Sequence, residues 1–242
     1  MSVAVFDIET RIDKRLLNQV LFRGRGLDDD GAYEEFRRAA FEDRGRDFAP
    51  LAFHVPISVA IASVNAEHGL ETIETLAGDA SGEETLVRAF WTRIEEFRGR
   101  WVSFNGRNFD LPVMELAALR YGCSAPRYFG GWRDAADDGE HYDLYDFLTR
   151  GGSYRLRGGL DVLLRMIGHP GKGRIEGSRV QELWDGGCLD EIHRYCRRDV
   201  LLTYLLFLRI ELVRGRLAAE RYGELVESVS TFADLGEDAS AP

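Results

Sequence analysis

The segment "VAVFDIET" (residues 3–10) restricts the fold more than any other part of the sequence. In a β-strand successive side chains point to opposite faces, so alternate residues share a face. One face of this segment is apolar, whereas on the other face Asp7 and Glu9 follow two valines. The pattern predicts a buried strand that ends in two carboxylates on one side, about 7 Å apart along the backbone.

The close placement of Asp7 and Glu9 is unfavourable unless something compensates for it. Two carboxylates that are partly removed from water repel each other, which pushes one of them to take up a proton. A divalent cation that prefers oxygen ligands, such as Mg²⁺ or Mn²⁺, removes this conflict. An isolated pair can equally mark the solvent-exposed end of a strand, so other acidic residues decide between the two interpretations.

Two more acidic residues favour the metal site. Asp110 follows the predicted strand "WVSFN" (101–105) at the start of a helix, where its charge suits the helix dipole, although alone it would be a capping residue. Asp199 lies in "YCRRDVLLTYLLFLRIEL", a helix whose later turns are strongly apolar and predicted to be buried. Tyr195 precedes Asp199 by four residues, so both side chains share one helical face.

The rest of the chain predicts strands first and helices later. Strands are expected at 54–65 and, antiparallel to it, at 70–77. Further helices are predicted at 81–100, where Ser81 and Glu84 form a capping box, at 108–122 with Asn108 as the cap, and at 142–150, 159–168, 177–185 and 189–214. Asp143 and Asp161 read as helix caps.

Residues 11–50 change character and predict two short surface helices inserted between the first two strands. The remaining pattern shows no repeat and no linker. We therefore expect one domain over residues 1–232, followed by a frayed tail at 233–242.

Composition excludes several classes of protein. The net charge of −10 argues against a protein that coats duplex DNA, because such proteins need a basic surface to neutralise phosphates. No stretch reaches the length of a membrane span, and the amino terminus lacks the features of a cleaved signal. Three cysteines without metal-ligand spacing fit reduced thiols, so we expect a cytoplasmic protein.

Three segments in order, "FDIET", "SFNGRNFDLP" and "YCRRDV", resemble the exonuclease motifs of the DEDD superfamily of 3′–5′ exonucleases. The third has the Tyr-x-x-x-Asp form of the tyrosine-bearing (DEDDy) subgroup. Together with "LAFHVPISVAIA", "HYDLYDFL" and "GLDVLLRMIGHPGK", they are similar to the predicted exonucleases related to the exonuclease domain of family B DNA polymerases. The resemblance covers nearly the whole chain except 11–45 and the tail. It implies an α/β, ribonuclease H-like fold, with a mixed sheet of about five strands flanked by helices.

The resemblance also implies a chemistry. Asp7, Glu9, Asp110 and Asp199 would hold two divalent ions, Mg²⁺ or Mn²⁺, about 4 Å apart. Tyr195 would orient the attacking water, since its ordinary pKa near 10 makes it a poor base at neutral pH. The expected reaction is hydrolysis of the 3′-terminal phosphodiester of single-stranded DNA, which releases nucleoside 5′-monophosphates.

Several residues are candidates for binding the substrate. By resemblance, Asn105 and Phe109 would contact the terminal nucleotide, although a turn and a core position are the simpler interpretations. Ile8 and Thr10 could offer backbone groups to the 3′ end. Residues 150–179, which include Lys172, hold seven basic and two acidic residues, a local charge of +5 that suits a single-stranded backbone or an ordinary solvated loop. "GKGRIEGS" lacks the first glycine of a P-loop, so nucleoside-triphosphate binding is not expected.

Three alternatives stay open at this point. In the histidine-bearing subgroup a histidine would stand at position 194, and His193 is one residue out of register with it. The substrate could be RNA or short oligoribonucleotides, since no residue distinguishes the 2′-hydroxyl. The third alternative is a catalytically silent nucleic-acid-binding module. The complete set of four carboxylates argues against it. An unidentified protein partner in repair or replication would suit the acidic surface.

Overall fold

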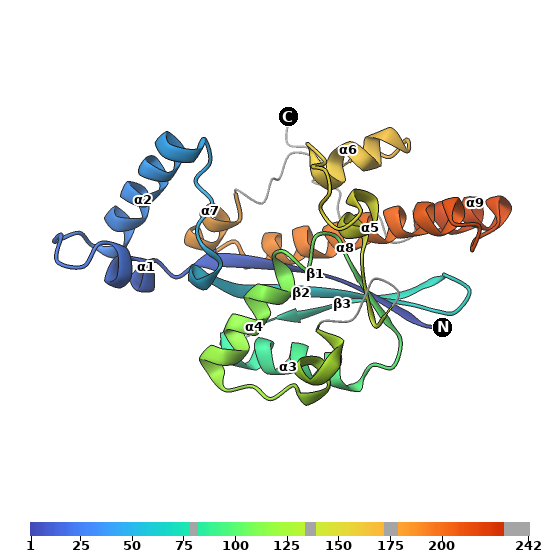
Figure 1. Cartoon of the computed structure of the whole chain (residues 1–242), viewed down its shortest axis with the longest axis horizontal. Helices are drawn as coiled ribbons and strands as arrows, with labels where there is room; N and C mark the ends of the chain where they lie inside the picture. The colour runs from blue at the N-terminus through green and yellow to red at the C-terminus, as the bar shows by residue number, and fades with distance from the viewer. Residues whose placement is uncertain (78–81, 134–138, 172–178, 230–242) are drawn as a thin grey trace.

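A five-stranded sheet forms the centre of the molecule in the computed structural model, which describes residues 1–77, 82–133, 139–171 and 179–229 (Figure 1). The sheet has the order β3-β2-β1-β4-β5. Its strands are β1 (Val3–Ile12), β2 (His54–Val64), β3 (Leu70–Ala77), β4 (Arg100–Ser103) and β5 (His141–Asp143). The first three pair antiparallel, whereas β4 runs parallel to β1 and β5 parallel to β4. The predicted mixed sheet is therefore confirmed.

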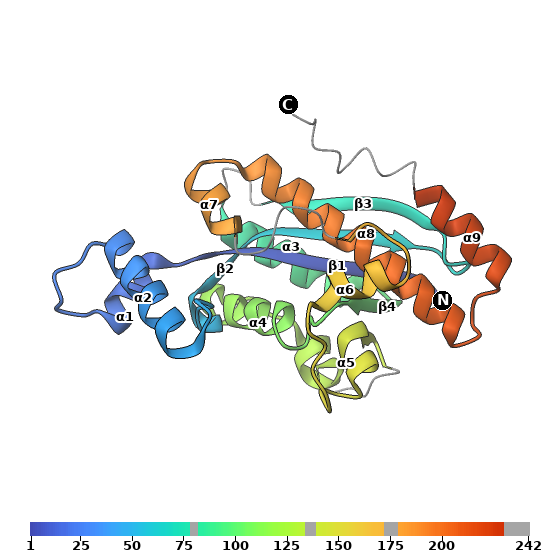
Figure 2. The ribbon, with the colours of Figure 1, turned by 90° about the horizontal axis from the view of Figure 1, so that it is seen from above.

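Alternate residues of β1 pack in two hydrophobic cores, one on each face of the sheet. Val3 and Val5 pack against the side of the sheet that is covered by α8 (Leu189–Val213). Phe6 and Ile8 pack on the other side, against α3 (Glu83–Glu96) and α4 (Asp110–Tyr121). Figure 2 shows α8 running across the sheet next to β1. The strand is thus buried from both sides up to the point where its carboxylates begin.

The remaining helices agree with the sequence in most places. They are α5 (Leu144–Thr149), α6 (Gly159–Met166), α7 (Val180–Asp185), α9 (Ala219–Ser228) and the π-helical turn η2 (Tyr128–Trp132). The helix predicted at 142–150 starts too early, because residues up to Asp143 pair with β4 as β5. Helix α9 was not predicted, and Leu225 is its one buried residue. None of the described helices has the length and apolar character needed to cross a membrane.

Three of the predicted caps are wrong. Helix α3 has Gly82 at its N-cap, Ser81 lies outside the described residues, and the Glu84 side chain pairs with Arg88. Helix α4 has Phe109 rather than Asn108 at its N-cap.

Asp161 is not a cap either. Gly158 occupies the N-cap of α6, and Asp161 pairs with Arg165 at 2.8 Å. Asp143 does cap α5, as predicted, by accepting the Tyr145 N–H.

The insertion between β1 and β2 is helical, as expected. Strand β1 continues to Ile12, and α1 (Lys14–Leu21), α2 (Asp29–Arg44) and the 3₁₀ turn η1 (Leu51–Phe53) follow before β2. Leu17 and Ala32 are fully buried in a small core of their own. Figure 1 shows the helix pair at the end of the sheet away from the amino terminus. The expected tail at 233–242 lies outside the described residues, and the single domain over 1–232 stays a prediction.

Replacing a core aromatic should destabilise the fold strongly. Phe90 is completely buried, and its ring centroid lies 5.7 Å from that of Phe6 and 5.2 Å from that of Trp91. We expect Phe90→Ala to lower the free energy of unfolding by about 3–5 kcal/mol, because it loses buried apolar contacts and leaves a cavity. Phe41→Ala, at a side chain that is 63% exposed, is the matched control and should change it by less than about 0.5 kcal/mol. Urea unfolding measures both, and equal losses would contradict this packing.

Candidate metal centre

Three carboxylates meet where α8 crosses β1. Asp7 and Glu9 come from the strand and Asp199 from the helix, and one oxygen of each lies within 4.8 Å of the others. Glu9 and Asp199 are buried, whereas Asp7 is half-buried. The packing of α8 on β1 and β2 brings together residues that are about 190 positions apart in sequence. We call these three residues the acidic trio.

A β-bulge lies directly beside the acidic trio. Glu9 pairs with Ser58 of β2, but Thr10 pairs with Pro56, so Ile57 is an extra residue on β2. Proline has no N–H to donate, and bulges are among the few places where a sheet tolerates it. Ile57 packs in a small core with Tyr195 of α8. The bulge therefore changes the direction of the ladder at Glu9 and supports the helix that carries Asp199.

Asp110 lies against the same strand, although it is not part of the trio. It is the first residue of α4 and is 4% exposed. One of its carboxylate oxygens accepts the backbone N–H of Ile8 at 3.1 Å. Because Ile8 lies between Asp7 and Glu9, this bond ties the fourth predicted carboxylate to the stretch of β1 that carries those two residues.

The turn that leads to Asp110 depends on Asp143. This buried carboxylate accepts the backbone N–H groups of Asn105 and Arg107, each at 2.9 Å. Burial raises the pKa of Asp143, and these hydrogen bonds counteract part of the rise. Asn105 adopts a φ of 66°, and a Cβ on Gly106 would lie 2.2 Å from the Ser103 hydroxyl oxygen, so a glycine is required there.

The sequence predicts Asp143 as a helix cap but does not reveal this second role. Asp143 is the last residue of β5, which is parallel to β4, and the carboxyl ends of parallel strands meet at one edge of a sheet. The role follows from this pairing of strands, which the short β5 segment does not reveal in the sequence.

Tyr195 lies one helical turn before Asp199 and hydrogen bonds with its carboxylate. The side chain is 5% exposed. Burial raises the pKa of Tyr195, and the nearby charges of Asp199 and Glu9 raise it further. The hydroxyl therefore stays protonated at neutral pH and acts as a hydrogen-bond donor.

His193 has a different partner. Its Nδ1 lies 2.9 Å from the Ser58 hydroxyl oxygen, and burial lowers the pKa of its ring. Of these two residues, Tyr195 rather than His193 therefore bonds to a member of the acidic trio.

The predicted substrate residues divide into two groups. Thr10 and Phe109 both contact His54, and together they line a cleft next to Glu9 (Thr10 Oγ1 to His54 Nδ1 2.8 Å; ring centroids of Phe109 and His54 5.2 Å apart). Ile8 does not fit its predicted role fully, since its side chain is buried and its N–H donates to Asp110.

Asn105 acts as a turn residue whose side-chain oxygen accepts the Asn108 amide. Lys172 lies outside the described residues.

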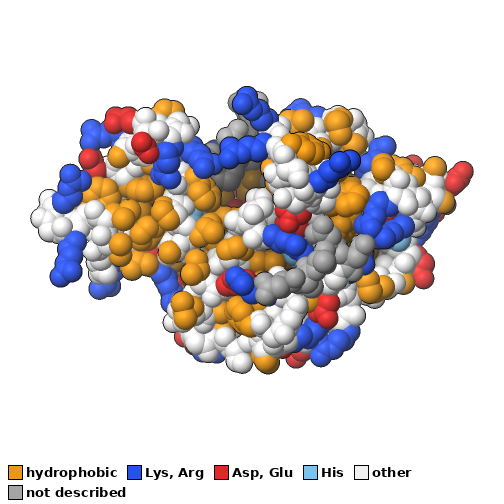
Figure 3. Space-filling view, in the orientation of Figure 1, with side chains coloured by type: hydrophobic (Ala, Val, Ile, Leu, Met, Phe, Trp, Pro, Cys, Tyr) orange, Lys and Arg blue, Asp and Glu red, His pale blue; other side chains and the backbone are white. Residues whose placement is uncertain are grey.

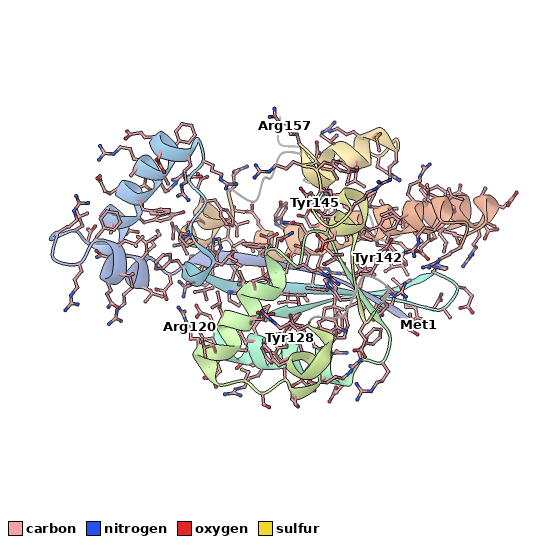
Figure 4. All side chains as sticks on the ribbon, in the orientation of Figure 1. Met1, Arg120, Tyr128, Tyr142, Tyr145 and Arg157 are labelled. Carbon is pink, nitrogen blue, oxygen red and sulfur yellow. The ribbon has the colours of Figure 1, made fainter. Side chains whose placement is uncertain are left out.

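The described part of the basic segment 150–179 is less cationic than its composition suggests. Arg165 pairs with Asp161, and Arg179 lies 4.0 Å from Glu182. Arg155 and Arg157 are exposed, and Figure 4 shows Arg157 beside α6. Figure 3 shows Lys and Arg side chains around the hollow between the insertion and α6.

The donor set of the acidic trio fits a hard divalent cation. Carboxylate oxygens are the ligands that Mg²⁺ and Mn²⁺ prefer. The nearest soft donor is Cys196, whose sulfur lies 4.0 Å from Asp7 Oδ2. Burial, together with Asp7 and Glu9, raises the pKa of this thiol well above its usual range, so it stays a neutral S–H group.

Comparison with known proteins places this geometry in a family. Residues 46–240 match the family described as predicted 3′–5′ exonucleases related to the exonuclease domain of PolB. The matched range includes Asp110, Tyr195 and Asp199, and it leaves out β1 and the helices of the insertion. A search of curated protein sequences finds no significant match.

Solved structures share the fold at low sequence identity. The family B DNA polymerase from the archaeon Pyrobaculum calidifontis superposes with a TM-score of 0.56 and 18% identity, over 88% of this chain and 24% of the polymerase. A zinc-bound complex of E. coli ExoI with single-stranded DNA matches with a TM-score of 0.41 and 13% identity, over 95% of this chain and 43% of that one. The chain thus spans less than half the length of these proteins.

The polymerase likeness confirms the ribonuclease H-like, α/β fold that the sequence predicted. The family match covers most of the chain and extends over the motifs that hold Asp110 and Asp199. The chain therefore belongs to the family of predicted 3′–5′ exonucleases related to the exonuclease domain of PolB.

Proposed function

We propose that this protein is a metal-dependent 3′–5′ exonuclease that hydrolyses the terminal phosphodiester of single-stranded DNA and releases nucleoside 5′-monophosphates. The observation that supports the proposal most strongly is the acidic trio. Asp7, Glu9 and Asp199 come from distant parts of the chain, yet their oxygens lie within 4.8 Å of one another. Family membership supports the same reaction class.

Each acidic residue has a place in this proposal. The trio, together with Asp110 on the adjoining helix, would hold two divalent cations. Cations in such a site activate the attacking water and stabilise negative charge on the leaving 3′ oxygen. Asp110 also ties the start of α4 to the backbone of β1 through Ile8, which fixes its distance from Asp7 and Glu9.

Tyr195 would orient the water. Its hydroxyl is held by Asp199 and protonated, so it offers a fixed hydrogen bond rather than a base. This arrangement supports the tyrosine-bearing subgroup.

The overall charge bears on how the substrate is bound. A net charge of −10 repels polyanions at a distance, so a nucleic-acid strand must be held at the cations and by local contacts. An unidentified protein partner in repair or replication could bring the strand to the site. Structures of ExoI include a complex with SSB-Ct, which makes recruitment by a partner a reasonable part of the proposal.

Divalent cations should stabilise the protein through the acidic trio. At about 100 times the dissociation constant, Mn²⁺ should add about 2.7 kcal/mol and raise the melting temperature by about 5 °C or more. Asp7→Asn should remove most of this shift. Without metal, the variant should melt no lower than the wild type, because one of three clustered negative charges is gone. Thermal melts with Mn²⁺ and with EDTA measure both effects. A wild type whose melting temperature does not change with Mn²⁺ would contradict the proposed metal site.

The reaction itself is tested with 5′-labelled oligonucleotides of DNA and RNA. With Mg²⁺ or Mn²⁺ we expect a ladder of products shortened from the 3′ end by single nucleotides, and none with EDTA. Asp199→Asn should lower the rate by more than about a hundredfold, since it removes a proposed metal ligand. Faster removal of ribonucleotides would change the substrate to RNA, and no cleavage of either would leave a silent binding module.

Tyr195 and His193 can be separated by one comparison. Tyr195→Phe should lower kcat about tenfold to a hundredfold with little effect on KM, because only the hydroxyl that orients the water is lost. His193→Ala is the matched control on the same helix and should stay within about threefold of the wild type. The opposite ranking in steady-state kinetics would assign the chain to the histidine-bearing subgroup.

A further inference from the structure

The cleft beside the acidic trio has a wall that the insertion supplies. It has a volume of about 450 Å³, within the usual range of ligand pockets. Glu9 and Thr10 of β1 line it together with Tyr33 and Arg37 of α2. Helix α2 precedes the residues that match the family, so this wall is a feature of the insertion. Glu9 belongs both to the cleft and to the acidic trio, so a ligand in the cleft would adjoin the metal centre.

Phe48 is the exposed aromatic residue of the described cleft lining. It follows α2, lines the cleft and is 47% exposed. Its ring centroid lies 5.0 Å from that of His54, with 31° between the rings, and 5.7 Å from that of Phe109. Two aromatic rings therefore contact Phe48, while much of its surface stays open to solvent.

Tyr33 is less suited to stacking. Lys14 Nζ lies 5.4 Å from its ring centroid and the Arg37 guanidinium lies 5.8 Å from it. These cations occupy the ring of Tyr33, so Phe48 is the better platform for a flat ligand.

The charges of the cleft restrict which part of a nucleic acid can enter. Its lining contains two arginines and five carboxylates, namely Glu9, Glu34, Asp47, Glu182 and Asp185. Arg37 is already paired with Asp47 at 2.8 Å. A run of phosphates would be repelled there, whereas a base and its sugar would not.

We propose that Phe48 is a further substrate-binding residue, and that the base of the 3′-terminal nucleotide stacks on it inside the cleft that α2 closes. The inference rests on the proposed function, because the phosphodiester of that nucleotide must lie at the acidic trio. An aromatic ring that stacks on a base accepts all four bases, which suits an enzyme that removes nucleotides in succession.

A comparison of normal and abasic 3′ ends tests the stacking directly. Removing the terminal base should lower the kcat/KM of the wild type about tenfold, the range expected for one base stacked on one aromatic ring. Phe48→Ala should lower kcat/KM for normal ends by a similar factor, mainly through KM, and should no longer distinguish the two ends. Phe48→Trp should restore the difference. Phe41→Ala, an exposed phenylalanine of α2 outside the cleft lining, should behave as the wild type.

A second readout reports on binding alone. With the wild type and a strand whose terminal linkage is a phosphorothioate that resists hydrolysis, a 2-aminopurine base at the 3′ end should lose fluorescence on binding, and Phe48→Ala should remove this quenching. The inference is overturned if Phe48→Ala still distinguishes normal from abasic ends, or if its effect is as large for an abasic site three nucleotides inside the strand. If the wild type digests DNA normally but Phe48→Ala and Phe41→Ala have the same kcat/KM, the role of Phe48 is wrong and the proposed function stands. If the wild type neither binds nor digests the oligonucleotide, both the role of Phe48 and the proposed function are wrong.

Discussion

Three carboxylates lie close together at the crossing of β1 and α8, and the elements around them must hold them there against their mutual repulsion. Asp7, Glu9 and Asp199 lie close enough to share a cation, and two of them are buried. A protein gains no stability from such an arrangement by itself, because desolvation and like charge both act against it. The large apolar surface of α8, buried against the sheet, holds the helix in place despite this cost. The mutual repulsion of the three carboxylates therefore destabilises this part of the fold, and bound cations would remove that repulsion.

The elements around the trio serve to fix it. The bulge beside Glu9 turns the ladder of β1 and β2, the Asp110–Ile8 hydrogen bond ties α4 to the strand, and Asp143 shapes the turn that leads to Asp110. The insertion adds a wall to the cleft at the end of β1. Glu9 belongs both to the acidic trio and to the cleft lining, so a single strand would position the proposed metal site and the proposed base-binding site.

Much of this was predictable from the sequence, and the reasons for the exceptions are physical. The alternation in residues 3–10 predicted β1 and its carboxylates, and the apolar turns after Asp199 predicted that α8 is buried. Strand β5 was missed because its three residues are too short to show a period, and α9 because it buries little. Local capping rules failed at Ser81, Asn108 and Asp161, where glycine or backbone geometry starts the helix instead. The role of Asp143 depends on two parallel strands ending at one edge, and the cleft on an insertion folding back, neither of which a local pattern contains.

The number of Mn²⁺ ions bound per chain tests whether the acidic trio and Asp110 hold two cations. Titration with Mn²⁺, followed by the electron paramagnetic resonance signal of the free ion, counts bound ions without relying on catalysis. We expect two ions per wild-type chain and a loss of tight binding in Asp199→Asn, with Glu191→Gln, in the first turn of the same helix, as the unchanged control. A wild type that binds no Mn²⁺, or an Asp199→Asn variant that binds as many ions as tightly, would contradict it.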